Sequence, residues 1–210
     1  MRGKIGKACV ALGILLVIGA FALFFYNQAE ARRAKETAER TLEQIMEHFQ
    51  RPQVSENTQS GEESTQAAEI TGPNHYKAEM PVVEIDGYGY IGYLSIPDLG
   101  KVLPIHSEWD YERLQIAPCR YKGGIMSGDL ILCAHNYASH FGDIARLDIG
   151  AKITFTDMNG IVTSYEVAEI TELPPTAIEE MESGEYPLTL FTCTYGGQTR
   201  ITVRCIKVQK

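Results

Sequence analysis

Three side chains with nucleophilic, acid–base or cationic chemistry lie at the ends of predicted strands in the C-terminal half of the chain. Cys193 follows the apolar run 188–192, and Arg200 begins the next run after a short glycine turn. His135 follows a third apolar run, 130–134. A thiolate can attack a carbonyl carbon, an imidazole can carry the proton, and a guanidinium can stabilise an oxyanion. This combination is typical of a cysteine acyl-transferase.

Two of these three assignments have alternatives nearby in the sequence. Arg204 lies on the same face of the last predicted strand, and Arg200 is preferred because it begins that strand, across the turn from Cys193. His140 follows His135 by five residues and is the alternative acid–base group.

The other cysteines do not predict a metal site. The chain has five cysteines, but none of the Cys or Cys/His spacings typical of zinc ligands. Cys133 and Cys205 lie within apolar strands, where we expect buried hydrophobic side chains rather than reactive thiols. A net charge of −8 argues against nucleic acid as a partner, because phosphate binding requires a basic surface.

An uncharged apolar segment near the N-terminus predicts a membrane anchor. The segment 8–29 has the length of about 20 residues that a helix needs to cross the hydrocarbon layer. A cleaved signal peptide is the alternative, but its apolar region usually has only ~7–15 residues before a site of small residues. Here the apolar core is longer and ends in the bulky residues 24–26. We therefore expect an uncleaved, single-pass anchor in the cell membrane.

The charges on either side of the anchor predict its orientation less directly. Arg32, Arg33 and Lys35 follow the anchor and reduce the charge asymmetry that orients a span. Because only seven residues precede the anchor, a short cytoplasmic tail with an extracellular C-terminal domain is the simplest arrangement. The predicted segments are a cytoplasmic tail (1–7), a transmembrane anchor (8–29), a juxtamembrane helix (30–50), a flexible stalk (51–80) and a catalytic domain (81–210).

The two connecting segments differ in composition. In 30–50, Leu42, Ile45, Met46 and Phe49 have helical spacing and predict a helix that continues from the membrane. We interpret it as a surface helix; the alternative is that its narrow apolar stripe meets a partner. The segment 51–80 is rich in polar residues and poor in apolar ones until Ile70, which predicts a flexible stalk.

The C-terminal domain is predicted to be a mostly β structure. Its short apolar runs end at Gly, Pro, Asn or Asp, and residues 157–160 contain an Asn-Gly hairpin turn. Eight short strands with little helix and no alternation of strand and helix favour a closed, mostly antiparallel barrel. The clearest predicted strands are 90–96, 101–105, 130–134, 152–156, 161–170, 188–192 and 200–208. Short helices are predicted at 110–116, 141–147 and 176–181.

This pattern resembles the sortase family over residues 88–208. The resemblance lies in Ala134-His135-Asn136 after a strand, Thr192-Cys193 at the end of a strand, and Arg200 at the start of the last strand, all behind an N-terminal anchor. The family more often has Gly where Ala134 stands. The resemblance implies a closed eight-stranded sortase-type β-barrel, preceded by the transmembrane helix. It also implies that Cys193 is the nucleophile, His135 the acid–base group and Arg200 the oxyanion-stabilising group.

The resemblance further implies a transpeptidase of a Gram-positive-like envelope. Such an enzyme cleaves an LPxTG-like sorting signal between Thr and Gly through a thioester acyl-enzyme. It then transfers the acyl group to an amine of a cell-wall precursor and needs no cofactor. The loop 171–186 would cover the bound signal. The substrate-binding residues implied are Thr192, Ala134, Asn136, Leu173 and Ile178.

Two alternatives predict different outcomes. A pilin-linking sortase is less favoured, because the sequence ends at Lys210 without a second span and no lid segment precedes the barrel. A membrane-tethered binding domain without catalysis predicts that Cys193, His135 and Arg200 do not come together in space.

Overall fold

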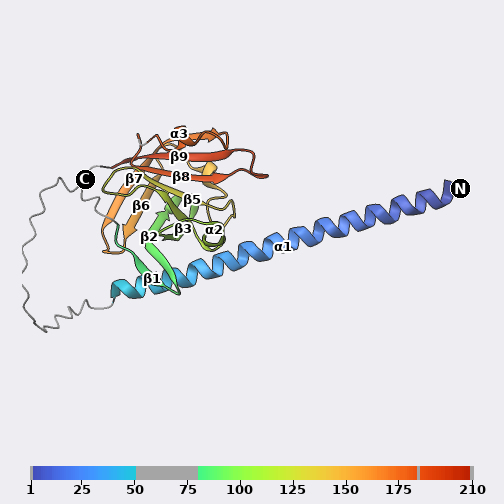
Figure 1. The fold of residues 1–210 in the computed structure, drawn as a ribbon, viewed down its shortest axis with the longest axis horizontal. Coiled ribbons are helices and arrows are strands. Elements are labelled where there is room, and N and C mark those ends of the chain that lie inside the picture. Colours follow the sequence, from blue (N-terminus) through green and yellow to red (C-terminus); the bar gives the residue numbers. More distant parts are fainter. Residues whose placement is uncertain (1, 51–79, 184, 209–210) are drawn as a thin grey trace, which may run out of the picture.

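The computed structural model describes residues 2–50, 80–183 and 185–208, and it consists of one long helix and a β-barrel (Figure 1). The helix α1 runs from Arg2 to Gln50. Its C-terminal part lies along the barrel, and its N-terminal part projects beyond it (Figure 1). The predicted stalk 51–80 lies outside the described residues, except for Met80.

Nine strands and a few short helical segments make up the described domain. The strands are β1 (Val83–Ile85), β2 (Tyr88–Ile96), β3 (Lys101–His106), β4 (Cys119–Lys122), β5 (Leu130–Ala134), β6 (Lys152–Asp157), β7 (Val162–Leu173), β8 (Leu188–Cys193) and β9 (Arg200–Lys207). The helices are α2 (Tyr111–Ile116) and α3 (Ile178–Met181), with 3₁₀ turns η1 (Pro97–Leu99) and η2 (Ile144–Arg146).

Eight of these strands close into a barrel, which confirms the predicted fold class. The strand order is β1-β2-β3-β4-β5-β8-β9-β7-β6, and a further pairing of β2 with β6 closes the ring from β2 to β6. Strand β1 pairs with β2 outside this ring. Strands β3 and β4, and β5 and β8, pair in parallel, whereas the other pairs in the described barrel are antiparallel.

The alternation of buried residues decides which side chains of β8 and β9 face outward. Leu188, Leu190, Val203 and Cys205 are fully buried in the main apolar core. Because successive side chains of a strand point to opposite faces, the odd-numbered residues of β8 and the even-numbered residues of β9 lie on the outer face. Cys193 ends β8 on that outer face.

The structure corrects three local expectations. Strands β1 and β4 were not predicted, because Val83–Ile85 and Cys119–Lys122 are too short for their alternation to be recognised. They become strands by pairing with β2 and β5. The helix expected at 141–147 is only the 3₁₀ turn Ile144–Arg146.

The third correction concerns the juxtamembrane part of α1, which is a docked helix rather than a surface helix. Ala34, Ala38, Thr41 and Ile45 recur every three or four residues and are buried. They therefore form one face of the helix. Ile45 joins Tyr90 and Met158 in a second apolar cluster. We call the four α1 residues the docking face.

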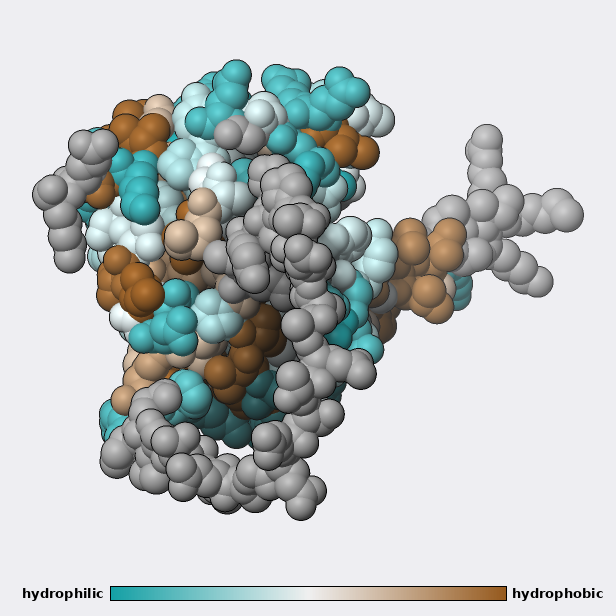
Figure 2. All heavy atoms as spheres, turned by 60° about the vertical axis from the view of Figure 1, so that its left-hand side comes forward, coloured by the Kyte–Doolittle hydropathy of each residue, from teal (hydrophilic) through white to brown (hydrophobic). Residues whose placement is uncertain are grey.

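The N-terminal part of α1 has the properties of a membrane anchor. Of the helices within the described residues, α1 is long and apolar enough to cross a membrane, with a mean hydropathy of 2.3 over its most apolar window. None of that window is buried against the barrel. Figure 2 shows apolar side chains on the segment that extends away from the barrel.

Candidate active site

Strand register brings the three predicted side chains to one mouth of the barrel. Cys193 and Arg200 are directly opposed partners in the antiparallel β8–β9 pair. Ala134 and Thr192 are partners in the parallel β5–β8 pair, so the residues that follow them, His135 and Cys193, leave adjacent strands at the same level. Adjacent strands lie about 4.8 Å apart. We call Cys193, His135 and Arg200 the rim trio.

A tight turn holds Cys193 opposite Arg200. Gly196 and Gly197 have φ angles of 83° and 72°, in the left-handed region that favours glycine. The Gly197 amide donates to the Thr194 carbonyl at 2.8 Å, and the Thr194 amide donates to the Thr199 carbonyl at 3.0 Å. The two threonine hydroxyls also bond each other at 2.9 Å. The turn is therefore fixed by its own hydrogen bonds.

His135 is oriented by the two residues that follow it. Its Nδ1 lies 2.9 Å from Oδ1 of Asn136, and the Asn136 Nδ2 donates to the Thr194 carbonyl at 3.4 Å. Because an amide oxygen only accepts, Nδ1 is the protonated nitrogen and Nε2 is left to exchange protons. The Tyr137 ring stacks on the imidazole, with 3.9 Å between centroids and 10° between planes.

His140, the alternative acid–base group, lies inside the barrel domain. It is fully buried, and its ring lies 5.4 Å from that of Tyr137. Burial lowers the pKa of His140 to about 4, with the charge of His135 acting in the same direction. The structure therefore favours half-buried His135 over His140 as the group that meets a substrate.

The two candidate arginines have different partners. Arg200 donates through Nη1 to the carbonyls of Gly197 and Thr199, at 3.4 and 3.3 Å. Arg204 is buried and donates through Nη2 to the Glu180 carbonyl at 2.8 Å. Its Nη1 also lies 3.5 Å from a carboxylate oxygen of Glu169. Arg204 thus connects β9 to α3 and β7, whereas Arg200 stays at the mouth with long, weak bonds.

The cysteine thiols also differ between the mouth and the interior of the barrel. The four cysteines of the barrel are free, and Cys193 is the half-buried one. Burial raises the pKa of Cys133 and of Cys205 to about 12, and it raises that of Cys119 further. Within the described part of the chain, no three His, Cys, Asp or Glu side chains are grouped to hold a metal ion.

Thr192 and Ala134, predicted to bind substrate, lie on the inner side of the sheet. Thr192 is 3% exposed and donates through its hydroxyl to the Ala134 carbonyl at 2.9 Å. Ala134 belongs to the apolar core. These contacts tie β8 to β5 immediately before Cys193 and His135, which favours a positioning role for both residues.

Leu173 lies on the side of Arg200 away from His135, and its side chain is buried, with 5% exposed. Leu173 is the register partner of Arg200, so Leu173, Arg200 and Cys193 form a row across β7, β9 and β8. Ile178 is exposed on α3. That helix packs on the outer face of the sheet, where the Thr202 hydroxyl lies 3.7 Å from the Met181 sulfur.

Sequence reasoning missed several residues around the trio. Tyr137 was not singled out, although an aromatic residue two positions after the histidine is a recognisable signal. A row of aromatic rings covers the outer face of β4 and β8, where Tyr121 lies between Trp109 and Phe191 at centroid distances of 5.7 and 5.3 Å. Phe191 lies two positions before Cys193 on the same strand, so the alternation of side chains could have predicted that Phe191 also faces outward.

Gly142 was missed for a different reason, because only the folded loop reveals its role. Its amide donates to the Tyr137 carbonyl at 2.9 Å. A Cβ at this position would lie 2.4 Å from the Asn136 carbonyl oxygen and 2.8 Å from that of Tyr137. Glycine is therefore required for the loop to close beneath His135.

Comparison with known proteins agrees with this geometry. A family model described as Sortase domain matches residues 94–208, which is 115 of the 210 residues. Sortase C1 from Streptococcus agalactiae is 28% identical, covers 60% of this chain and 72% of its own, and has a TM-score of 0.52. Sortase C1 from Streptococcus suis is 27% identical, with coverages of 58% and 74% and a TM-score of 0.50.

Sortase A from Corynebacterium diphtheriae has the same fold at lower identity. It is 24% identical, with coverages of 59% and 62% and a TM-score of 0.52. No curated protein matches the chain. Because the matched structures include sortases A and C, they leave the class within the family open. The family match, the closed barrel and the rim trio lead to one conclusion: the chain belongs to the sortases, which are cysteine transpeptidases.

Proposed function

We propose that this sortase cleaves an LPxTG-like sorting signal between Thr and Gly and transfers the acyl group to an amine of a cell-wall precursor. The observation that carries the proposal is the register of β5, β8 and β9, which brings His135, Cys193 and Arg200 to one mouth of the barrel. A binding domain without catalysis would not require this convergence.

The first half of the reaction forms a thioester. The Cys193 sulfur attacks the carbonyl carbon of the signal's Thr, and the thiol proton moves to Nε2 of His135. The C–N bond then breaks, and His135 returns that proton to the departing Gly amine. The Asn136 contact that fixes the imidazole tautomer keeps Nε2 available for both transfers.

The second half releases the acyl group. The incoming amine attacks the thioester carbon and gives a proton to His135, while the C–S bond breaks. The Cys193 thiolate then recovers a proton from the imidazole, so the enzyme ends in its starting state. Every proton is accounted for by Cys193, His135 and the two amines, and no cofactor takes part.

Arg200 stabilises the oxyanion that forms in both halves. Among the described residues, its guanidinium bonds two carbonyls of its own turn over long distances in the free enzyme. Substrate can replace these bonds at little cost, because hydrogen bonds at 3.3–3.4 Å are weak. A donor placed in this way is worth about 3 kcal/mol in the transition state.

The signal binds along the outer face of the sheet, beside the row formed by Leu173, Arg200 and Cys193. Ile178, exposed on α3, provides an apolar contact for the Leu of the signal, whereas Leu173 is buried and acts indirectly. Asn136 borders the scissile bond. Thr192 and Ala134 act indirectly, by holding β8 against β5. The chain is placed in the cell membrane by a single pass of 8–29, with the barrel outside the cell.

Intact mass spectrometry tests the proposal. The full chain in detergent is incubated with an LPxTG peptide, in parallel with Cys193→Ala and with the matched control Cys205→Ala, whose thiol is buried in the core. We expect an acyl adduct on the wild type and on Cys205→Ala, but none on Cys193→Ala. Added amine should discharge the adduct.

The identity of the amine separates the two transpeptidase alternatives. A peptide with the amine of a cell-wall precursor should discharge the adduct faster than a pilin-derived lysine peptide. The reverse order would point to a pilin-linking sortase. If no signal peptide forms an adduct and Cys193 also resists alkylation, the domain is a binding module rather than an enzyme.

A further inference from the structure

The helix that contains the anchor also fixes the barrel in space. α1 is continuous from Arg2 to Gln50, so the apolar segment and the docking face belong to one helix. The docking face is buried, and Ile45 is fully enclosed between Tyr90 and Met158. The Gln44 side chain also donates to Asp86 at 3.5 Å. The anchor therefore determines which end of the barrel points toward the membrane.

That end is the mouth that holds the rim trio. The Ser139 hydroxyl, in the loop after His135, donates to the Ala31 carbonyl of α1 at 3.4 Å. The helix α2, in the crossover between β3 and β4, also packs against α1. Burial, followed by the nearby Glu30 and Tyr26, raises the pKa of Tyr137, which is consistent with the same placement. Ile45 and Phe49 contact the barrel further from the anchor.

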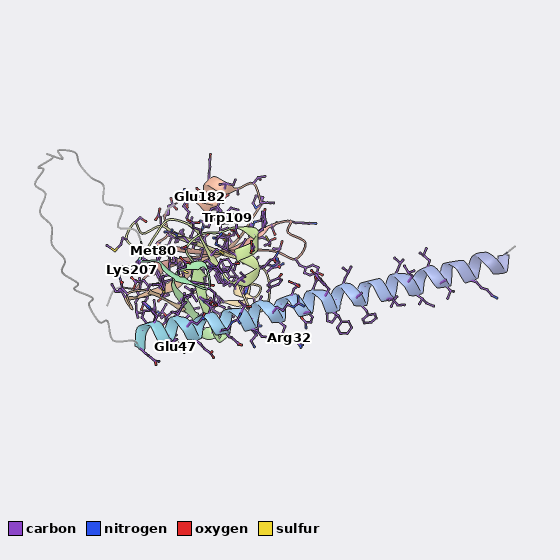
Figure 3. The ribbon with its side chains drawn as sticks, turned by 60° about the horizontal axis from the view of Figure 1, so that its bottom comes forward. Arg32, Glu47, Met80, Trp109, Glu182 and Lys207 are labelled. Carbon is purple, nitrogen blue, oxygen red and sulfur yellow. The ribbon has the colours of Figure 1, made fainter. Side chains whose placement is uncertain are left out.

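The figures show the same direction. The β8–β9 turn and α2 lie on the side of the barrel from which the N-terminal part of α1 projects (Figure 1). Trp109 lies nearer to that side, whereas Met80 and Lys207 lie toward the opposite end, beyond Glu47 of the helix (Figure 3).

The spacing along α1 places the mouth at the level of the lipid headgroups. Ala31 lies five residues beyond Tyr26, the last bulky residue of the apolar segment, which is about 7.5 Å along the helix axis. The headgroup layer on each side of a bilayer is roughly 5–8 Å thick. Loops that reach Ala31 from the barrel side therefore meet this layer when α1 spans the membrane.

The exposed aromatic residues of the described barrel have the distribution that such a contact requires. Trp109, Tyr111 and Tyr195 are 42%, 80% and 97% exposed. Tyr195 lies in the β8–β9 turn beside the rim trio, and Trp109 and Tyr111 lie in the crossover that contains α2, on the same side of the barrel (Figure 1). Exposed aliphatic residues such as Ile161 and Met126 lie in turns elsewhere. Trp and Tyr favour the membrane–water interface, where the ring is buried and its polar group stays hydrated.

We propose that the mouth of the barrel faces the membrane, with Trp109, Tyr111 and Tyr195 resting in the headgroup layer of the bilayer. The inference goes beyond the transpeptidase reaction but rests on the proposed span of α1. Its consequence is that the rim trio acts on groups held close to the membrane surface, and not on groups that diffuse far from it.

Trp109 makes the test direct, because it is the single tryptophan of the chain. The full chain is reconstituted in phosphatidylcholine vesicles that contain lipids brominated either near the headgroup or near the chain end. In vesicles, we expect the Trp109 emission of the wild type to be blue-shifted relative to that of the Tyr111→Ser/Tyr195→Ser variant, which should insert less. We also expect stronger quenching by the shallow bromine than by the deep one.

A docking variant separates orientation from chance contact. Ala34→Glu/Ala38→Glu places two carboxylates on the docking face and should release the barrel and abolish most of the quenching. Lys35→Glu, on the exposed face of the same turns, is the control and should leave quenching unchanged. Circular dichroism shows whether each variant keeps the barrel, and a variant that loses it is replaced by the single substitution Ala38→Glu.

Three results overturn the inference in distinguishable ways. If the chain remains with the vesicles but Trp109 is not quenched at either depth, the mouth does not face the bilayer, while the anchor and the proposed reaction stand. If the chain does not insert into vesicles, the proposed span fails, and the orientation fails with it. Equal quenching of wild type and the docking variant would also contradict an orientation set by α1.

Discussion

The mouth and the body of this barrel contain the same three kinds of functional group under opposite conditions. At the mouth, the rim trio is partly exposed: His135 is held by Asn136 and Tyr137, and Arg200 makes long bonds to carbonyls of its own turn. In the body, Cys205 and His140 are fully buried, and Arg204 is held by Glu169 and the Glu180 carbonyl. Residue type alone therefore does not select the groups that can react.

For Cys205 and Arg204, which lie within β9, the difference follows from position along the strand, whereas His140 is buried in the loop that follows β5. A side chain within a strand is covered by neighbouring strands or helices, so its charged form loses hydration and is disfavoured. A side chain at the end of a strand keeps access to water and to substrate while the strand still fixes its backbone. Side chains at the mouth are therefore both rigidly placed and accessible to substrate, whereas side chains in the body are rigidly placed but not accessible.

Thiol alkylation should show the largest difference between the two regions. In the folded chain, iodoacetamide should modify Cys193 at least about a hundredfold faster than Cys133 or Cys205, because the thiolate is the reactive form. Burial holds the pKa of these two thiols at about 12. Peptide mass mapping over time measures each site separately. Modification of Cys205 at the rate of Cys193 in folded protein would remove the distinction.

The two arginines should differ in what their loss affects. Arg200→Ala should lower kcat/KM by about 10²–10³-fold, the usual cost of removing an oxyanion donor. Arg204→Ala should keep kcat/KM within about tenfold but lower the Tm, because a hydrogen bond of a charged group contributes about 1.5–3 kcal/mol. Transpeptidation kinetics and thermal unfolding of both variants provide the check. A Tm loss in Arg200→Ala with normal kinetics would reverse the assignment.

The buried histidines should make the fold sensitive to acid. Burial first, and then Arg113, lowers the pKa of His106 to about 4, and His140 has the same value. The unfolded chain, with histidine pKa values near 6.5, binds more protons between pH 6.5 and 4. Stability is therefore complete above about pH 6.5 and falls toward pH 4, by about 1.4 kcal/mol per pH unit for each histidine.

His106→Phe tests this effect in a site that suits an apolar ring. His106 is fully buried and stacks on Tyr90 at 4.4 Å. The substitution should roughly halve the pH slope of the free energy of unfolding between about pH 6 and 4.5, leaving the part due to His140. Denaturant unfolding at a series of pH values measures the slope. An unchanged slope would show that carboxylates, and not buried histidines, set the acid sensitivity.

Sequence patterns predicted the ends of strands well, and this was enough to find the rim trio. The apolar runs before His135 and Cys193 are continuous, so their ends are clear. The pairing between these runs was not predictable, because Ala134 and Thr192 are 58 positions apart and alternation gives the face of a strand but not its partner. The convergence of the trio could therefore be stated only as an expectation.

The docking of α1 was only the less favoured alternative, for a related reason. The docking face includes Ala34, Ala38 and Thr41, which are too small or too polar to form an obvious apolar stripe. Small residues allow a helix to approach a sheet closely, but their burial depends on a surface that is distant in the sequence. The helix was therefore predictable and its partner was not.

Tyr137 lies on the boundary between the two regions, because its ring contacts both His135 and His140. Tyr137→Leu removes the stack that orients His135, and aromatic pairs contribute about 0.5–1.5 kcal/mol. We expect kcat to fall by up to about tenfold, which corresponds to 1.36 kcal/mol, with KM unchanged. Tyr137→Phe is the control and should keep kcat, because the ring and not the hydroxyl makes the contact. Steady-state kinetics of both variants measure the effect. An equal loss of kcat in Tyr137→Phe would assign the effect to the hydroxyl, and the stacked ring would then not be what orients His135.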